Sequence, residues 1–223
     1  MAKYNKNKTT EFKIVSPFFD EVPEPVEEAQ SLLSTEDIID GKHFERGIIT
    51  AIDRPFLTIR NCIFSQNFFI ECKLKSAQIS DVRFENCDLS NMSLASGSFH
   101  RVEFVSCKLV GTNLSETTMN NVLFKDCNAH YINLSMSKFT QVKFAQCDLK
   151  SGNLNENRLN GVIYESCSLV EADFSHTSLR NIDLKTSHIE GIQLNIADLK
   201  GAIVTSLQAM DLISLFGIII DDD

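Results

Sequence analysis

Apolar residues recur at every fifth position along most of this chain. Between Ile59 and Leu199, every residue whose number ends in 4 or 9 is apolar, 29 of 29 positions. A second set of smaller residues precedes each of these centres by two positions, and the position between them is mostly polar. A period of five fits neither a helix nor a simple strand, so the chain must bend inward at the same point of every unit. This pattern is typical of a repeat architecture.

A longer period of 20 shows how many units close one coil. Valine recurs at positions 82, 102, 122, 142 and 162, and cysteine recurs at positions 87, 107, 127, 147 and 167. Four units therefore make one turn, and the 144 residues from Leu57 to Lys200 correspond to just over seven coils. Neighbouring parallel segments lie about 4.8 Å apart, which gives a rod of roughly 35 Å. We predict an all-β fold, a right-handed quadrilateral β-helix.

The two ends of the rod differ from its body. Residues 1–35 contain three prolines and an acidic patch, which predicts a flexible acidic lead, and residues 36–56 are expected to form an N-terminal cap. The β-helix is expected over residues 57–202, followed by a C-terminal helix and strand over 203–223. Thr205 and Gln208 have the spacing of a capping box, and Gly217 is a candidate helix stop.

The C-terminal helix is apolar almost all round, although a helix packed on a rod end buries only one face. A second copy of the chain is the simplest partner for the other face. We therefore expect a homodimer formed through the C-terminus, while a lid on a monomer remains the alternative. The candidate interface residues are Leu207, Met210, Leu212, Ile213 and Phe216.

Composition and motifs indicate neither an enzyme nor a membrane protein. The chain has no apolar run long enough to span a bilayer, and its first residues lack the apolar core of a signal peptide, so we expect a cytoplasmic protein. All seven cysteines occupy the small inward position and form no CxxC pair, which predicts buried thiols. We found no phosphate-binding loop, metal-ligand cluster or catalytic triad, and we predict no cofactor.

The outward positions divide the rod into an acidic and a basic side. The acidic side, centred on Leu89, Leu109 and Leu149, has a net charge of −3, because Lys108 and Lys150 offset five acidic residues. These five are candidate partner-binding residues: Glu71, Asp88, Asp148, Glu171 and Glu190. The opposite, basic side has a net charge of +4 and carries Arg60, Arg101, Lys138, Arg158, Arg180 and Lys200 against Asp81 and Asp198.

Several units resemble a known family. Residues 87–91, 172–176 and 197–201 are similar to the A(D/N)LXX pentapeptide repeat. Residues 96–107 and 201–220 resemble the chromosomal Qnr-like quinolone-resistance proteins of Gram-positive bacteria. This resemblance implies a C-terminal dimer and a DNA-mimicking role, in which an acidic rod binds DNA gyrase or topoisomerase IV and protects it from quinolones. The expected partner is thus a topoisomerase, with no nucleic acid and no membrane bound directly.

Two features separate this chain from a simple mimic of DNA. Three sides of the rod together carry only −5, whereas duplex DNA of the same length carries roughly 20 charges. The plasmid-borne Qnr proteins use projecting loops for protection, but the register here is unbroken from Ile59 to Leu199. The alternative is a generic β-helical protein–protein interaction module with no topoisomerase role.

Overall fold

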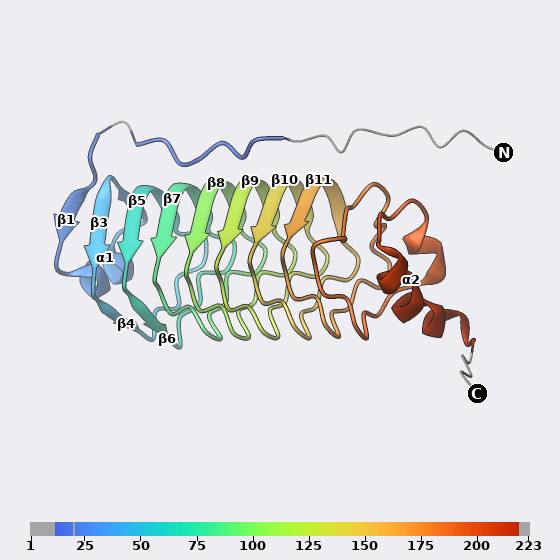
Figure 1. Cartoon of the computed structure of the whole chain (residues 1–223). Coiled ribbons are helices and arrows are strands. Elements are labelled where there is room, and N and C mark those ends of the chain that lie inside the picture. The colour runs from blue at the N-terminus through green and yellow to red at the C-terminus, as the bar shows by residue number, and fades with distance from the viewer. Residues whose placement is uncertain (1–11, 20, 219–223) are drawn as a thin grey trace.

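The computed structural model describes residues 12–19 and 21–218, which form a straight rod with a helix near each end (Figure 1). The main sheet has the strand order β1-β3-β5-β7-β8-β9-β10-β11, with β2 also paired to β5, and β4 and β6 form a second sheet. The predicted right-handed quadrilateral β-helix is confirmed. Its elements are β1 (Glu24–Val26), α1 (Ala29–Thr35), β2 (Ile38–Asp40), β3 (Lys42–Glu45), β4 (Ile48–Thr50), β5 (Thr58–Ser65), β6 (Phe68–Ile70), β7 (Gln78–Glu85), β8 (Ser98–Val105), β9 (Thr118–Lys125), β10 (Lys138–Ala145), β11 (Arg158–Glu165), η1 (Ile196–Leu199), α2 (Ser206–Ile213) and η2 (Ser214–Phe216).

Neighbouring coils pair in parallel with an offset of 20 residues. Val102 lies opposite Val122, and Phe104 lies opposite Phe124. This register stacks like residues in the interior, as the period of 20 predicts. One inward column is a stack of aromatic rings whose centroids lie 4.7–5.2 Å apart: Phe44, Phe64, Phe84, Phe104, Phe124, Phe144 and Tyr164.

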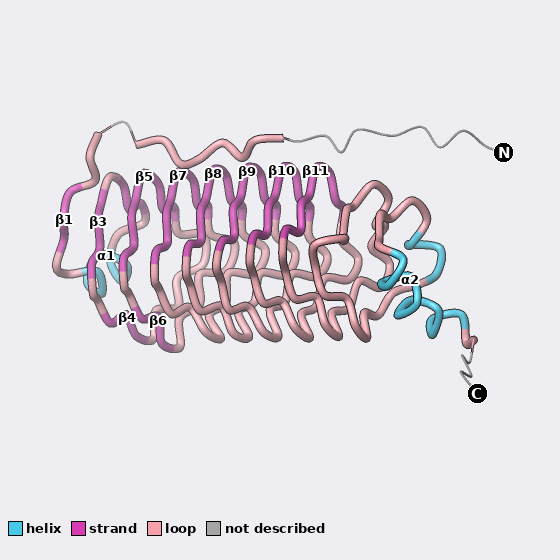
Figure 2. Tube along the Cα trace, viewed as in Figure 1, coloured by secondary structure: helices cyan, strands magenta, loops and turns pink. Residues whose placement is uncertain are grey.

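The four sides of the coil have two kinds of backbone (Figure 2). Strands β5 and β7 to β11 each cover two adjoining sides, whereas the other two sides are held by isolated bridges such as Asp88 to Lys108. On those two sides the outward Asp or Asn binds the amide two residues later. Asp88 Oδ1 accepts a hydrogen bond of 2.9 Å from the Ser90 amide, and such turns interrupt regular strand geometry.

The corners of the coil require left-handed backbone. The residue two positions after nearly every inward centre has a positive φ, between 52° and 66° at the 26 non-glycine residues that adopt it. This conformation costs about 1–2 kcal/mol per residue for an L-amino acid. Its amide hydrogen bonds offset part of that cost: the Asn86 amide, for example, donates to the Val105 carbonyl at 2.9 Å.

The seven cysteines are free and buried, which confirms the expectation of buried thiols. Each of those in the stack from Cys87 to Cys167 donates its S–H to a neighbouring backbone carbonyl; Cys127 Sγ, for example, lies 3.4 Å from the Phe104 oxygen. Burial raises the pKa of the Cys62 thiol to about 11, so this group stays protonated near neutral pH.

The coil begins earlier than the predicted boundary at residue 57. Strands β2 and β3 pair with β5, and β4 pairs with β6, so residues 38–50 add winding within the segment expected to be a cap. The apolar register is interrupted between them and the main body because Arg54 takes a centre position. Its guanidinium binds the backbone oxygen of Ser34 at the end of α1 and the Asp37 carboxylate.

The predicted lead of residues 1–35 also contains described structure. Residues 12–19, here called the strap, run in extended form along the rod, and α1 packs on β4 (Figure 1). Residues 1–11 of the predicted flexible lead lie outside the described residues.

The capping box at the C-terminal end is confirmed. The Thr205 amide donates to Gln208 Oε1 at 2.9 Å, and the Gln208 amide donates to Thr205 Oγ1 at 3.1 Å. Gln208 Nε2 also donates to the backbone oxygens of Leu184 and Ser187, which ties α2 to the last coils. Gly217 follows η2 with a φ of +68°. The strand expected near the C-terminus falls largely outside the described residues.

Candidate functional site

The five candidate acidic residues lie along one side of the rod, the side built from isolated bridges around Leu89, Leu109 and Leu149. Asp88 and Asp148 belong to one outward column, in which successive bridges join residues 88, 108, 128, 148, 168 and 188. With one coil every 4.8 Å or so, these two carboxylates are separated by about 14 Å. The side therefore carries a sparse line of carboxylates.

Basic side chains on the same side contact most of these carboxylates. Lys108 Nζ lies 3.2 Å from Asp88 Oδ2, and His130 Nε2 lies 2.5 Å from Asp148 Oδ2. Glu171 accepts a hydrogen bond of 2.9 Å from Ser151 Oγ and lies 3.8 Å from Lys150 Nζ.

At the two ends of the acidic side the pairing is weaker. Glu190 lies 3.9 Å from His188 Nδ1. Glu71 makes no ion pair within the described part of the chain. The most available carboxylate is therefore at the N-terminal end of the side.

Local hydrogen bonds orient the two aspartates. Asp88 Oδ1 accepts from the Ser90 amide at 2.9 Å, and Asp148 Oδ1 accepts from the Lys150 amide at 3.1 Å. Partial burial would raise the pKa of Asp88, but hydrogen bonds from Ser90 and Lys108 outweigh it and hold the pKa below its usual value. Asp88 is thus a fixed anion over the ordinary pH range.

An apolar patch on this side was missed from the sequence. It consists of Ile48, Phe68 and Ile70, which are 65%, 51% and 50% exposed. Ile48 pairs with Phe68 across β4 and β6, at the outward positions that later coils fill with polar residues. The apolar residues on both sides of the centre at Phe69 were the available signal. Phe68 and Ile70 also line a shallow hollow of about 740 Å³, whose wall includes Asp53, Glu71, Lys73 and Asp88.

The five candidate dimer residues divide into two groups. Leu207, Met210 and Phe216 are 74%, 54% and 54% exposed, whereas Leu212 is 7% exposed and Ile213 is half-buried. Leu212 belongs to the core cluster of the rod. The exposed apolar residues of α2 and η2 are therefore Leu207, Met210 and Phe216. Leu212 instead packs α2 against its own coil.

The described part of the chain shows no cluster of three or more metal-ligating side chains. Within residues 12–19 and 21–218, no helix is long and apolar enough to cross a membrane.

Comparison with solved structures finds other pentapeptide repeat proteins. QnrB1, a plasmid-mediated fluoroquinolone resistance protein, is 19% identical in its trypsin-treated form, with a TM-score of 0.47, 82% of this chain covered and 97% of that one. HetL, involved in heterocyst differentiation regulation in the cyanobacterium Nostoc, is 18% identical with a TM-score of 0.45, over 76% of this chain and 90% of that one. A protein of the Arabidopsis thaliana thylakoid lumen is 27% identical with a TM-score of 0.35, over 51% of this chain and 72% of that one.

No curated protein matches the chain. Family models do match. The pentapeptide repeat region matches residues 77–144, 97–161 and 137–209, and the model of eight pentapeptide repeats matches residues 58–91. Together these matches cover more than half of the chain, and they coincide with the stacked coils described above. The chain therefore belongs to the pentapeptide repeat family.

Proposed function

We propose that this protein is a non-enzymatic, cytoplasmic rod that binds DNA gyrase or topoisomerase IV through its acidic side and protects the enzyme from quinolones. The choice of partner rests on the resemblance of residues 96–107 and 201–220 to Qnr-like proteins. The choice of surface rests on this structure.

The observation that carries the choice of surface is the joint exposure of apolar and acidic groups at the N-terminal end of the acidic side. Phe68 and Ile70 are half-exposed beside Glu71 and Asp88, around one hollow. Exposed apolar clusters rimmed by charged residues are typical of protein–protein contact sites. A basic surface that carries an apolar side chain would complement this one.

Charge alone is a weak basis for binding at this side. Its two aspartates are three coils apart, Asp88 and Glu171 each lie near a lysine, and Asp148 contacts His130. Exposed ion pairs of this kind contribute little to stability, yet they weaken the field that a partner meets. The proposed complex is therefore anchored by the apolar patch and oriented by the carboxylates, with DNA mimicry confined to the shape of the rod and a local acidic stripe.

The same pairing favours a second candidate function. A rod whose charges are balanced within each side also suits a general protein–protein interaction module with no topoisomerase role. The two candidates differ in their salt dependence, because only a basic DNA-binding groove would add strong electrostatic steering.

We also propose that two copies associate through the C-terminus. Leu207, Met210 and Phe216 form an exposed apolar surface on α2 and η2, and a second copy supplies a matching surface by two-fold symmetry. The dimer would place two rods end to end and double the length available to a topoisomerase.

The functional test compares three variants for gyrase affinity at low and moderate salt, and for supercoiling with and without ciprofloxacin. Reversal of Asp88, Asp148 and Glu171 to lysine should lower affinity at least tenfold and flatten its salt dependence. Asp88→Asn with Asp148→Asn keeps the local turns and removes only charge, so it should give an intermediate loss. Lys138→Glu with Arg158→Glu, on the basic side, should leave binding intact.

The apolar anchor is tested in the same assay. Phe68→Ser should lower gyrase affinity, whereas Ile38→Ser, which changes a similarly exposed residue (55%) on the basic side, should not. Two outcomes would favour the general interaction module: an equal loss of gyrase affinity from substitutions on the acidic and the basic side, or no gyrase affinity of the unmodified protein at micromolar concentration.

A further inference from the structure

The strap lies along one corner of the coil, from β5 to β11 (Figure 1). The Val15 amide donates to Asn121 Oδ1 at 3.0 Å, and the Phe18 amide donates to Asp81 Oδ1 at 2.9 Å. The ring of Phe12 lies beside Gly161: a Cβ atom added to this glycine would be 3.4 Å from the ring. The strap corner, defined as Asp81, Arg101, Asn121, Gln141 and Gly161, is thus in contact with one extended segment.

The strap and the coil have matching repeats. Phe12, Val15 and Phe18 are three residues apart, and their partners Gly161, Asn121 and Asp81 are 40 residues apart, which is two coils. Three extended residues span about 10 Å and two coils span about 9.6 Å. An extended chain can therefore present an equivalent amide to every second coil without strain.

The acceptors on the corner are held in place by other side chains of the coil. Arg101 clamps Asp81 through both carboxylate oxygens, each at 2.6 Å, and Asn120 accepts a hydrogen bond of 2.7 Å from Asn121 Nδ2. Burial would raise the pKa of Asp81, but the hydrogen bonds from Arg101 and the Phe18 amide prevail and lower it. The carboxylate therefore stays ionised and able to accept.

Burial at this corner follows the strap. Asp81 and Asn121 are 7% and 8% exposed. Asn181, which has the same left-handed backbone farther along the same corner, is exposed, and so is Asn91 at another corner. The strap therefore shields these two side chains, together with Arg101 over Asp81 and Asn120 beside Asn121.

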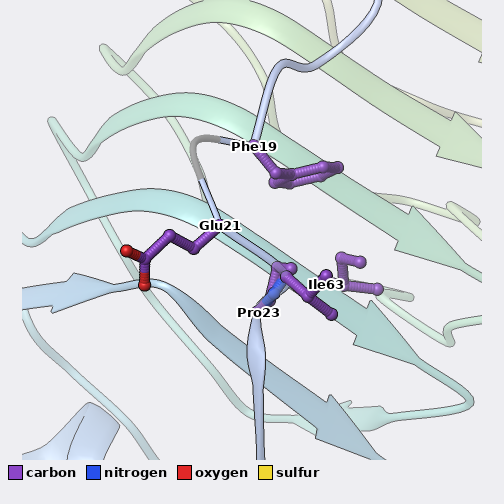
Figure 3. A pocket seen from close by; sticks show the side chains of 5 residues that line it. Phe19, Glu21, Pro23 and Ile63 are labelled. Carbon is purple, nitrogen blue, oxygen red and sulfur yellow. The ribbon is translucent and has the colours of Figure 1, made fainter.

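Apolar side chains anchor the C-terminal end of the strap. Figure 3 shows Phe19, Pro23 and Ile63 around a hollow of about 490 Å³, with the Glu21 side chain directed away from it. Phe12, Ile14, Pro17 and Phe19 are partly buried, while Val15 and Phe18 point outward, 53% and 65% exposed. The corner therefore binds backbone amides and also contacts apolar side chains, a combination typical of binding sites for extended peptides.

We propose that the strap corner is a binding groove for extended polypeptide and that residues 12–19 are its displaceable intramolecular occupant. A partner's segment fits if it is extended, offers free amides three residues apart and carries apolar or proline residues between them. Tethering gives the strap a high effective concentration, so the groove is closed until the strap is displaced. This site lies away from the acidic side and does not depend on the topoisomerase proposal.

Closure is tested in the full chain by proline substitution. Val15→Pro with Phe18→Pro removes both amide donors and keeps an extended backbone. Ser16→Pro is the matched control, because the Ser16 amide is not among the strap's contacts with the corner. Trypsin cleavage after Lys13, followed by mass spectrometry, should be at least tenfold faster in the double variant than in the unmodified protein, and unchanged in the control. Equal cleavage rates in the unmodified protein and the double variant would overturn the closed strap.

Peptide binding is tested with a fluorescent peptide of residues 12–19. Fluorescence anisotropy should show saturable binding to the double proline variant and at least tenfold weaker binding to the unmodified protein. Adding Asn121→Ala should weaken binding at least fivefold, whereas Asn181→Ala, an asparagine of equal backbone conformation outside the strap, should not. No binding by the double variant at about 1 mM peptide, or no effect of Asn121→Ala, would refute the groove.

Discussion

At the residue scale, the aromatic stack shows how strictly the interior selects its side chains. Six phenylalanines and Tyr164 form the column, and the rings from Phe64 to Tyr164 are within 10° of parallel. Tyr164 is 1% exposed, and its hydroxyl has no hydrogen-bond partner in the described structure. Burial of the hydroxyl raises the pKa of Tyr164. This hydroxyl is the one polar group of the column.

Tyr164→Phe should therefore stabilise the protein. Removing a buried hydroxyl that lacks a partner recovers about 1–2 kcal/mol of desolvation free energy, and the phenylalanine ring continues the existing stack. For a chain of this size, that gain corresponds to a rise of roughly 2–8 °C in melting temperature. Thermal melting followed by circular dichroism measures it; an unchanged or lower midpoint would show that the hydroxyl is satisfied.

Phe124→Asp tests the opposite limit of the same column. The ring of Phe124 lies between Phe104 and Phe144 at 4.9 and 4.7 Å, and a carboxylate there would be buried without a partner. The expected cost is several kcal/mol, so the melting temperature should fall by about 10 °C or more. Phe124→Leu, which keeps the site apolar, should lose less than half as much.

At the element scale, α2 is attached to the coil by a side chain as well as by packing. Gln208 Nε2 donates to the backbone oxygens of Leu184 and Ser187 at 2.8 and 2.7 Å, while Leu212 enters the core. The same Gln208 completes the capping box through the Thr205 amide. One residue thus both begins the helix and closes the last coils.

Gln208→Ala should loosen the end of the rod. The substitution leaves two carbonyls and one amide without their partner, at a cost of about 2–4 kcal/mol, whereas Thr205→Ala removes only the cap and costs about 1 kcal/mol. Hydrogen exchange should accelerate in residues 182–213 of the Gln208 variant and remain unchanged in β7 to β10. Similar exchange in the two variants would mean that the coil contacts of Gln208 contribute nothing.

The elements that the sequence predicts are those carried by repeated apolar burial. The inward centres, the stacked cysteines and the capping box each have a periodic or local signal. The first winding was harder to find because Arg54 occupies a centre position, where it binds the end of α1. The strap had no signal of this kind, because amides of Val15 and Phe18 bind side chains more than 60 residues away. The apolar segment from Phe12 to Phe19 was its only sequence trace.

The outward phases bring the five candidate acidic residues to one side of the rod, but the sequence does not predict their ion pairs. His130 and Asp148 are 18 residues apart, and their contact depends on the orientation of side chains on two adjacent coils. The period of 20 specifies which backbone positions are neighbours. It does not specify which of two nearby cations a carboxylate will bind.

At the scale of the whole molecule, the exposed face of α2 and η2 predicts association. Leu207→Glu with Phe216→Glu should give a folded monomer, because both residues are more than half exposed in the rod. Leu212→Glu is the contrasting variant: it should lower the melting temperature, because it places a carboxylate in the core. Light scattering at tens of micromolar measures the mass, and an unmodified chain that is already monomeric would exclude the dimer.

The strap also limits how the rod can change in length. Adding or removing one coil between Asp81 and Gly161 would alter that distance by about 4.8 Å, or one and a half extended residues. No whole number of strap residues compensates for that step, whereas two coils match three residues. The three-residue spacing of the strap and the two-coil spacing of its acceptors therefore act together as a ruler. As long as each strap residue keeps its partner, the number of coils along this stretch can change only in steps of two.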